Sequence, residues 1–137
     1  MNIIRFNPDD TISVESLVVE ERIKHALETT LMLIYTGMTR SSTEILSQQR
    51  KNIADRAKIL SEMRDAVDEG KEYLLKDHLD DFGRLLNRGW ELKKRLADRI
   101  TNPRIEQMYE TALGAGALGG TVCGAGGGRI FAALLSF

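Results

Sequence analysis

The stretch GGTVCGAGGGRIFAALL, residues 119–135, sets five glycine and alanine positions between two apolar segments. LGGTVC (118–123) and RIFAALLSF (129–137) have the composition of strands. The glycines between them tolerate positive φ and expose backbone N–H groups, which can form an anion-binding concavity. Composition alone leaves two interpretations open at this point, a wide hairpin turn and a phosphate-binding loop.

The preceding segment, TNPRIEQMYETALGAGALGG (101–120), predicts a helix that begins at Pro103. Thr101 or Asn102 can cap its start, and the glycines of GAGALG (114–119) end it. That hexapeptide matches G-x-G-x-x-G, but a dinucleotide-binding fingerprint follows a strand and opens a helix, which is the reverse of this context. The sequence contains no G-x-x-x-x-G-K-[ST] motif either, so neither common nucleotide-binding loop is predicted.

Residues 41–100 contain no proline and have helical periodicity. One apolar stripe recurs at seven-residue intervals on one helix face: Leu46, Ile53, Leu60 and Val67. A second stripe runs between Leu75 and Leu96, and DEGK (68–71) is the expected break. We therefore predict two long helices, joined at Gly70 and packed antiparallel. The basic run KKR (93–95) is interpreted as a solvated helix face.

The first part of the chain has strand and turn signals. NIIRF (2–6) and TISVESLVV (11–19) flank the turn sequence NPDD (7–10) and predict a β-hairpin. EERIKHALETT (20–30) is a short amphipathic helix candidate, and LMLIYTG (31–37) is interpreted as a buried central strand. Strands, then helices, then strands indicate an α+β domain whose mostly antiparallel sheet is covered by helices.

Bulk properties restrict the class of protein. A chain of 137 residues is expected to form a single domain, and 42% apolar with 28% charged residues is ordinary for a globular protein. The net charge of −1 gives no basis for binding nucleic acid or an anionic membrane. One cysteine excludes an intramolecular disulfide, and no apolar run has the length of a membrane span or a signal peptide core. We therefore expect a cytoplasmic protein without membrane or nucleic-acid partners.

A second stretch, YTGMTRSSTEIL (35–46), leads from a strand into a helix. Ser41 or Ser42 can cap that helix, with Glu44 close to the capping-box position and Arg40 just before it. A helix N-terminus attracts anions. The stretch is therefore compatible with a capped helix beside a solvated arginine, or with a site for a phosphate or sugar oxygen.

YTGMTRSSTEIL and AGALGGTVCGAGGGRIFAAL (115–134) together resemble the carboxy-terminal half of the GHMP kinases, a family that includes galactokinase, homoserine kinase and mevalonate kinase. The likeness is greatest to bacterial enzymes that phosphorylate D-glycero-D-manno-heptose 7-phosphate, and it extends over nearly the whole chain from IIRFNPDDTISVESL (3–17). It implies a ferredoxin-like α+β fold in which residues 1–137 form one substrate-side domain, with a long helical pair.

The resemblance also implies the site. Substrate contacts are expected from four residues of the second stretch: Thr36, Arg40, Ser41 and Ser42. A phosphate-proximal glycine loop is expected from seven consecutive residues: Cys123, Gly124, Ala125, Gly126, Gly127, Gly128 and Arg129. The family usually has glycine where this chain has Arg129, which can clamp a phosphate, crowd the loop or point to solvent. Cys123 is interpreted as a small packing residue.

The family's nucleotide loop, P-x-x-x-G-L-G-S-S, and its catalytic acid have no counterpart in this sequence. The resemblance therefore implies an amino-terminal ATP-binding domain outside this chain, which would be a fragment, a truncated reading frame or one part of a split enzyme. ATP and Mg²⁺ are expected for the complete enzyme, whereas this chain alone is expected to bind neither tightly, to contain no catalytic residue or metal site, and to be inactive.

Two functions stay open. The first is the substrate-side half of an ATP-dependent kinase for a sugar or sugar phosphate, heptose 7-phosphate being the expected substrate, with the missing kinase domain as its partner. The second is a non-catalytic α+β module that binds a partner or self-associates.

Overall fold

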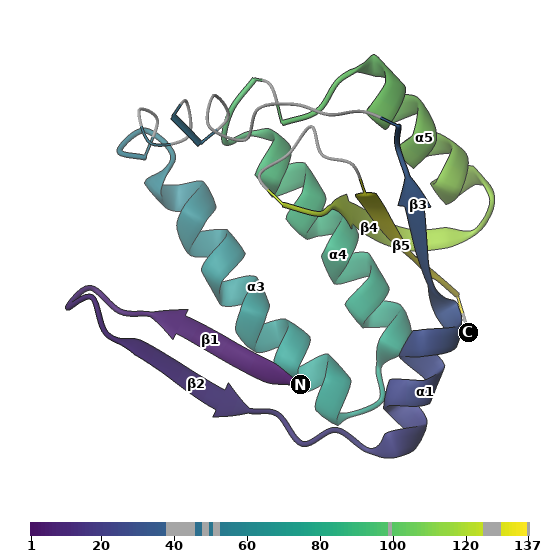
Figure 1. Ribbon diagram of the computed structural model, residues 1–137, viewed down its shortest axis with the longest axis horizontal. Helices are drawn as coiled ribbons and strands as arrows, with labels where there is room; N and C mark the ends of the chain where they lie inside the picture. The colour runs from purple at the N-terminus through teal and green to yellow at the C-terminus, as the bar shows by residue number, and fades with distance from the viewer. Residues whose placement is uncertain (38–45, 48–49, 51–52, 99, 125–129, 137) are drawn as a thin grey trace.

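The computed structural model describes residues 1–37, 46–47, 50, 53–98, 100–124 and 130–136 (Figure 1). The elements in chain order are β1 (Asn2–Phe6), β2 (Ile12–Ser16), α1 (Glu21–Thr30), β3 (Leu31–Tyr35), α3 (Ala57–Leu75), α4 (Leu79–Lys94), α5 (Pro103–Gly114), β4 (Ala117–Val122) and β5 (Ile130–Leu135). The α+β class with antiparallel sheets is confirmed. So are the amino-terminal hairpin, the helix that follows it and the two strands on either side of the glycine loop.

The strands form a two-stranded sheet, β1-β2, and a three-stranded antiparallel sheet in the order β3-β5-β4. The prediction of a buried central strand at residues 31–37 is wrong, because β3 lies at an edge and β5 is central. Leu33 and Tyr35 are 64% and 69% exposed. A continuous apolar run indicates burial on both faces only where both faces are covered. Here α4 packs along β4, which leaves much of β3 open.

A helix pair forms, but its first helix begins at Ala57 and not before Leu46, and its joint is elsewhere. Helix α3 continues through Gly70 to Leu75, and the turn to α4 contains Asp77, whose φ is +61°. Gly70 is buried where α3 meets α4, because a Cβ there would lie 3.2 Å from Leu85 Cδ2 and 3.4 Å from Phe82 Cε2. This glycine therefore serves close helix packing and does not break the helix.

The predicted seven-residue stripe does not form a buried helix face, and only Leu60 and Val67 of it lie in α3. All four of its members are exposed: Leu46, Ile53, Leu60 and Val67. Ile59, Gly70 and Leu74 are buried instead. A spacing of seven residues fits one helix face, but it does not say which face another helix covers.

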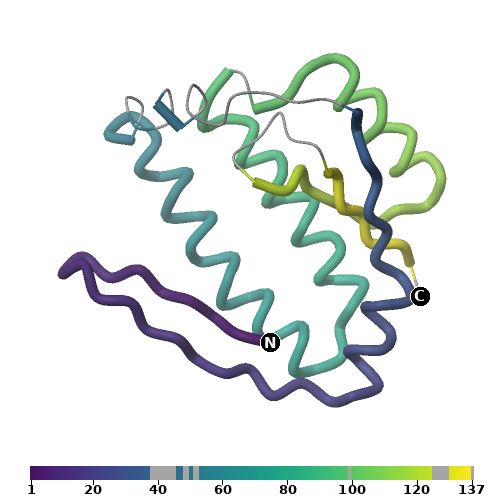
Figure 2. Tube along the Cα trace, in the orientation of Figure 1, coloured from purple at the N-terminus to yellow at the C-terminus, as the bar shows by residue number. Residues whose placement is uncertain are grey.

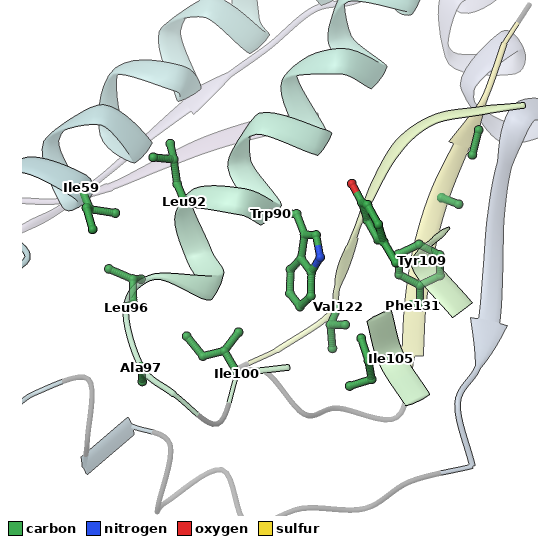
Figure 3. Close-up of a cluster of buried hydrophobic side chains, with 12 residues drawn as sticks. Ile59, Trp90, Leu92, Leu96, Ala97, Ile100, Ile105, Tyr109, Val122 and Phe131 are labelled. Carbon is green, nitrogen blue, oxygen red and sulfur yellow. The ribbon is translucent and has the colours of Figure 1, made fainter. Parts of the chain in front are cut away.

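The main core joins α4, α5 and the three-stranded sheet (Figure 3). Trp90 is fully buried, and its ring centroid lies 6.0 Å from that of Tyr109. Tyr109 in turn meets Phe131 edge-on at 5.4 Å. Aromatic pairs at such distances add to the stability that burial alone supplies. This core fixes the position of β4 and β5, and therefore of the two stems of the glycine loop.

The β1-β2 hairpin lies alongside α3, apart from the three-stranded sheet (Figure 2). Ile3 and Leu17 are buried. Arg5 forms an ion pair with Asp68 of α3 at 2.6 Å, and Lys71 of α3 forms one with a glutamate of β2. The opposite face of the hairpin is apolar and open to solvent. Its four large side chains are between 55% and 79% exposed: Ile4, Phe6, Ile12 and Val14.

Candidate functional site

The sheet register brings the two stretches singled out in the sequence to one edge of the sheet. Tyr35, the last residue of β3, pairs with Ile130, the first residue of β5. On the other side of β5, the Cys123 N–H donates to the Ile130 carbonyl oxygen at 2.9 Å. The chain segments that leave β3 and β4 therefore start on either side of the same residue. Sequence patterns could suggest each stretch separately, but not this adjacency.

Four predicted or neighbouring site residues can be placed at this edge. Thr36 is 1% exposed, and Gly37 follows it with φ +71°. Cys123 is exposed, which contradicts its interpretation as a packing residue, and Gly124 has φ +87°. Positive φ at Gly124 agrees with the expectation that the loop needs glycine for its backbone conformation. The remaining predicted residues lie outside the described ranges, so their roles stay predictions: Arg40, Ser41, Ser42, Ala125, Gly126, Gly127, Gly128 and Arg129.

Lys93, at the end of α4, holds the stem of the glycine loop. Its ammonium donates to the carbonyl oxygens of Val122 and Gly124, each at 2.8 Å. Burial lowers the pKa of Lys93 below its usual range, because the charged form has lost part of its hydration. The interpretation of the KKR run as a solvated helix face is therefore wrong for this residue. A basic residue at the end of an amphipathic helix was the available signal, but the partners of Lys93 are distant in sequence.

A second cation approaches the same edge from α5. A Cβ added to Gly37 would lie 3.8 Å from an Nη atom of Arg104. Arg104 is in the first turn of α5, where the predicted cap is present: the Asn102 side chain accepts from the N–H groups of Arg104 and Ile105 at 3.0 and 3.1 Å. Sequence reasoning identified the helix start and missed Arg104, because nothing in sequence connects it with residue 37.

The neighbouring Lys94 has a different role from Lys93. Its ammonium pairs with Glu91 at 2.8 Å and with Glu106 at 3.1 Å, and it lies 5.9 Å from the centroid of the Trp90 ring. These contacts join α4 to α5. The two adjacent lysines therefore have different roles: Lys94 joins α4 to α5, and Lys93 binds the stem of the glycine loop.

An apolar groove of about 480 Å³ runs between the hairpin, α3 and α4. Ile3, Val67 and Leu86 are among its lining residues, and Lys93 and Thr121 also border it. The groove therefore includes a residue that also holds the glycine-loop stem.

The chemistry available at this edge is cationic. Lys93, Arg104 and a positive-φ glycine turn are suited to oxyanions such as phosphate. Among the described residues, no group of three or more histidine, cysteine, aspartate or glutamate side chains is placed to hold a metal ion. None of the helices in the described part of the chain has the length and apolarity needed to cross a membrane.

Comparison with known proteins defines the class. Residues 71–136 match the family model described as GHMP kinases C terminal. This segment contains α4, α5, β4, the glycine loop and β5. Residues 71–136 thus match the carboxy-terminal domain of the GHMP kinases, which confirms the resemblance identified in the sequence.

Individual relatives are kinases of small molecules. The chain is 28% identical over 131 residues to the D-glycero-α-D-manno-heptose 7-phosphate kinase of Campylobacter jejuni, covering 93% of this chain and 38% of that kinase. It is 30% identical over 118 residues to the mevalonate kinase of Thermococcus onnurineus, covering 79% and 34% of the two chains. This chain therefore spans little more than a third of the length of these relatives.

The fold also matches solved structures. The L. major mevalonate kinase crystallised with R-mevalonate superposes with a TM-score of 0.78 at 20% identity, over 99% of this chain and 40% of that one. The hairpin, the helix pair and the sheet therefore belong to one arrangement that a complete kinase also contains.

Proposed function

We propose that this chain supplies the substrate-side half of an ATP-dependent kinase that phosphorylates a small molecule, with heptose 7-phosphate or a related sugar phosphate as its substrate. The observation that carries the proposal is the convergence of residues 36–37 and 123–124 on Ile130. The heptose kinase relative, aligned over 93% of this chain, supports the choice of a sugar phosphate.

Roles follow from the positions of the residues. Thr36, Arg40, Ser41 and Ser42 would contact the sugar phosphate, and the loop from Cys123 to Arg129 would lie against the phosphates of the nucleotide. Phosphoryl transfer depends mainly on positioning and on electrostatic stabilisation. In GHMP kinases ATP supplies the phosphoryl group and Mg²⁺ neutralises its charge. The described residues suit phosphate better than metal, so we assign Mg²⁺ binding to the other half of the enzyme.

The proposal requires a partner domain. The heptose kinase relative is 38% covered by this chain, and the rest of that enzyme has no counterpart here. The exposed apolar face of the hairpin is a surface that such a domain can cover, since contiguous apolar patches commonly mark protein interfaces. Without that domain, we propose that the chain is inactive and binds ATP weakly.

Two experiments test this function. The first is to sequence the genomic DNA upstream of the Met1 codon, where an in-frame segment encoding Gly-Leu-Gly-Ser-Ser is expected. The second is a chimera in which this chain replaces the corresponding carboxy-terminal segment of the C. jejuni kinase. We expect it to release ADP in the presence of heptose 7-phosphate and to lose that activity in the Arg40→Ala variant. A folded chimera that binds ATP but shows no transfer to any sugar phosphate would contradict the proposal.

The hairpin face also favours a second candidate, a non-catalytic module that binds a partner or a second copy through Ile4, Phe6, Ile12 and Val14. This function needs no anion site at the sheet edge. Absence of phosphate and polyphosphate binding, together with tight self-association, would favour it over the kinase.

A further inference from the structure

We propose that Lys93 is the positioning residue of the glycine loop: it fixes the loop stem through the carbonyl groups of Val122 and Gly124 and places a positive charge beside Gly124. The inference rests on the proposed function for the identity of the anion. Its structural part, the hold on the stem, does not.

The stem contacts have a clear geometry. The Lys93 ammonium donates hydrogen bonds to the carbonyl oxygens of Val122 and Gly124, the two residues that flank Cys123. The intervening Cys123 N–H is already used, because it donates to Ile130 on β5. The stem is thus held from two sides, by α4 through carbonyl groups and by β5 through an N–H group. This leaves the chain little freedom in the direction in which it leaves β4.

The same contacts affect the electrostatics of the loop. A carbonyl oxygen that accepts from Lys93 is turned toward α4 and is not available to face a bound phosphate. Two negative ends of peptide dipoles are thereby removed from the surface that an anion would meet. The ammonium adds a positive charge beside Gly124, and hydrogen bonds to a charged donor are stronger than those between neutral groups.

The charge of Lys93 also lacks a carboxylate partner in the part of the chain that the structure describes. Lys94, one residue later, is paired with both Glu91 and Glu106. The glycine loop itself, residues 125–129, contains no acidic residue. No carboxylate in the described part of the chain therefore neutralises the charge of Lys93, and a bound oxyanion would do so.

A purely structural staple between α4 and β4 is the alternative, and substitution can separate the two. Lys93→Met removes both the donors and the charge. Lys93→Gln keeps N–H donors without charge, whereas Lys93→Arg keeps both. Lys76→Met is the matched control, because it removes the same charge from an exposed lysine that pairs with Glu72 at the end of α3.

The experiment uses the 137-residue chain labelled with ¹⁵N. Hydrogen exchange of the Cys123 amide, which donates to Ile130, is followed by NMR, and the affinity for inorganic tripolyphosphate is measured by titration. We expect Lys93→Met to speed exchange at the Cys123 amide at least tenfold and to weaken tripolyphosphate binding about tenfold, since 1.4 kcal/mol corresponds to a factor of ten. Lys93→Gln should weaken binding nearly as much, Lys93→Arg should restore most of it, and Lys76→Met should change neither quantity.

The outcomes distinguish this inference from the proposed function. Unchanged exchange at the Cys123 amide in Lys93→Met would overturn the positioning role, whatever the chain binds. Faster exchange with equal tripolyphosphate affinity in all variants would overturn the role of the charge. If the wild-type chain binds no tripolyphosphate, both the proposed anion site and the proposed role of the Lys93 charge are wrong. The exchange measurement still shows whether Lys93 positions the loop stem.

Discussion

The Cα of Gly119 in β4 lies directly against the backbone of Gly83 in α4: a Cβ at position 119 would be 2.2 Å from the Gly83 carbonyl oxygen. No side-chain rotamer can relieve that contact, because the obstacle is backbone. The two glycines therefore set the distance between helix and sheet.

We expect Gly119→Ala to destabilise the protein by about 3 kcal/mol or more, at the upper end of what overpacking costs in a core. Gly89→Ala in α4 is the matched control, since nothing lies within 4 Å of a Cβ at position 89. Alanine has the higher helix propensity, so Gly89→Ala should stabilise by about 0.5–1 kcal/mol. Urea unfolding of the three proteins measures both changes. Equal stability of the two variants would show that α4 does not approach β4 this closely.

A second prediction concerns alkaline pH and Tyr109. Burial raises the pKa of the Tyr109 hydroxyl to about 12, and the carboxylates of Glu91 and Glu106 act in the same direction. The same hydroxyl donates to Asn87 of α4. A tyrosine in the unfolded chain ionises near pH 10. Between about pH 10 and pH 12 the unfolded state therefore loses its proton first, and the free energy of unfolding should fall by roughly 2–3 kcal/mol across that window.

Tyr109→Phe tests this assignment. The variant should be less stable at pH 7 by about 1–3 kcal/mol, because Asn87 loses a buried partner. Its stability should then fall less between pH 10 and pH 12 than that of the wild type, since phenylalanine has no proton to lose. Denaturant titrations at pH 8, 10 and 11.5 would show the difference in slope. Parallel profiles for the two proteins would mean that another group causes the alkaline loss.

The hairpin face should cause self-association of the isolated chain. Phe6 and Ile12 are paired across the two strands and are both solvent-exposed. Burying such large apolar side chains contributes about 1.5–3 kcal/mol each. We expect a dimer or larger oligomer in sedimentation experiments, and a double Phe6→Ser, Ile12→Ser variant that dissociates at least tenfold more readily.

The control for that prediction is on the other exposed strand. Leu33 and Tyr35 of β3 form a second open apolar surface, at the edge of the three-stranded sheet. A Leu33→Ser, Tyr35→Ser variant should associate like the wild type if the hairpin is the contact surface. Loss of association in this variant alone would move the interface to β3. A monomeric wild type would show that neither surface causes association.

Local signals in the sequence were sufficient for most elements. The Asn102 cap with Pro103 at the first helical position marked the start of α5, and NPDD marked the hairpin turn. The predictions that were wrong depended on which helix or strand packs against a given surface. Gly70 has the composition of a break, but it is a contact point between two helices, and the apolar run of β3 lies at an open edge.

The same limit applies to the site. The glycine loop and the residues after β3 were identified from composition and family resemblance, whereas Lys93 and Arg104 were not. Lys93 reaches partners 29 and 31 residues away. Arg104, in α5, approaches Gly37, which follows β3. Such contacts are set by the tertiary arrangement, and a single sequence contains no local signal for them.

The last prediction concerns nucleotide binding and turnover by the isolated chain. Lys93 and Arg104 approach the sheet edge from α4 and α5, and this chain spans 38% of the length of the heptose kinase relative. We propose that a partner domain holds the phosphate chain from the other side in the complete enzyme. ATP should therefore bind with a dissociation constant in the millimolar range or weaker, which corresponds to about −4 kcal/mol. We propose that the catalytic acid and the nucleotide loop belong to the other half of the enzyme, so ATP hydrolysis and phosphate transfer to sugars by the isolated chain should both stay at the level of a buffer blank. Isothermal titration calorimetry and an ADP-release assay measure the two quantities. Micromolar ATP binding would mean that the sheet edge is a complete nucleotide site, and turnover abolished by Arg40→Ala would mean that the catalytic groups lie within these 137 residues.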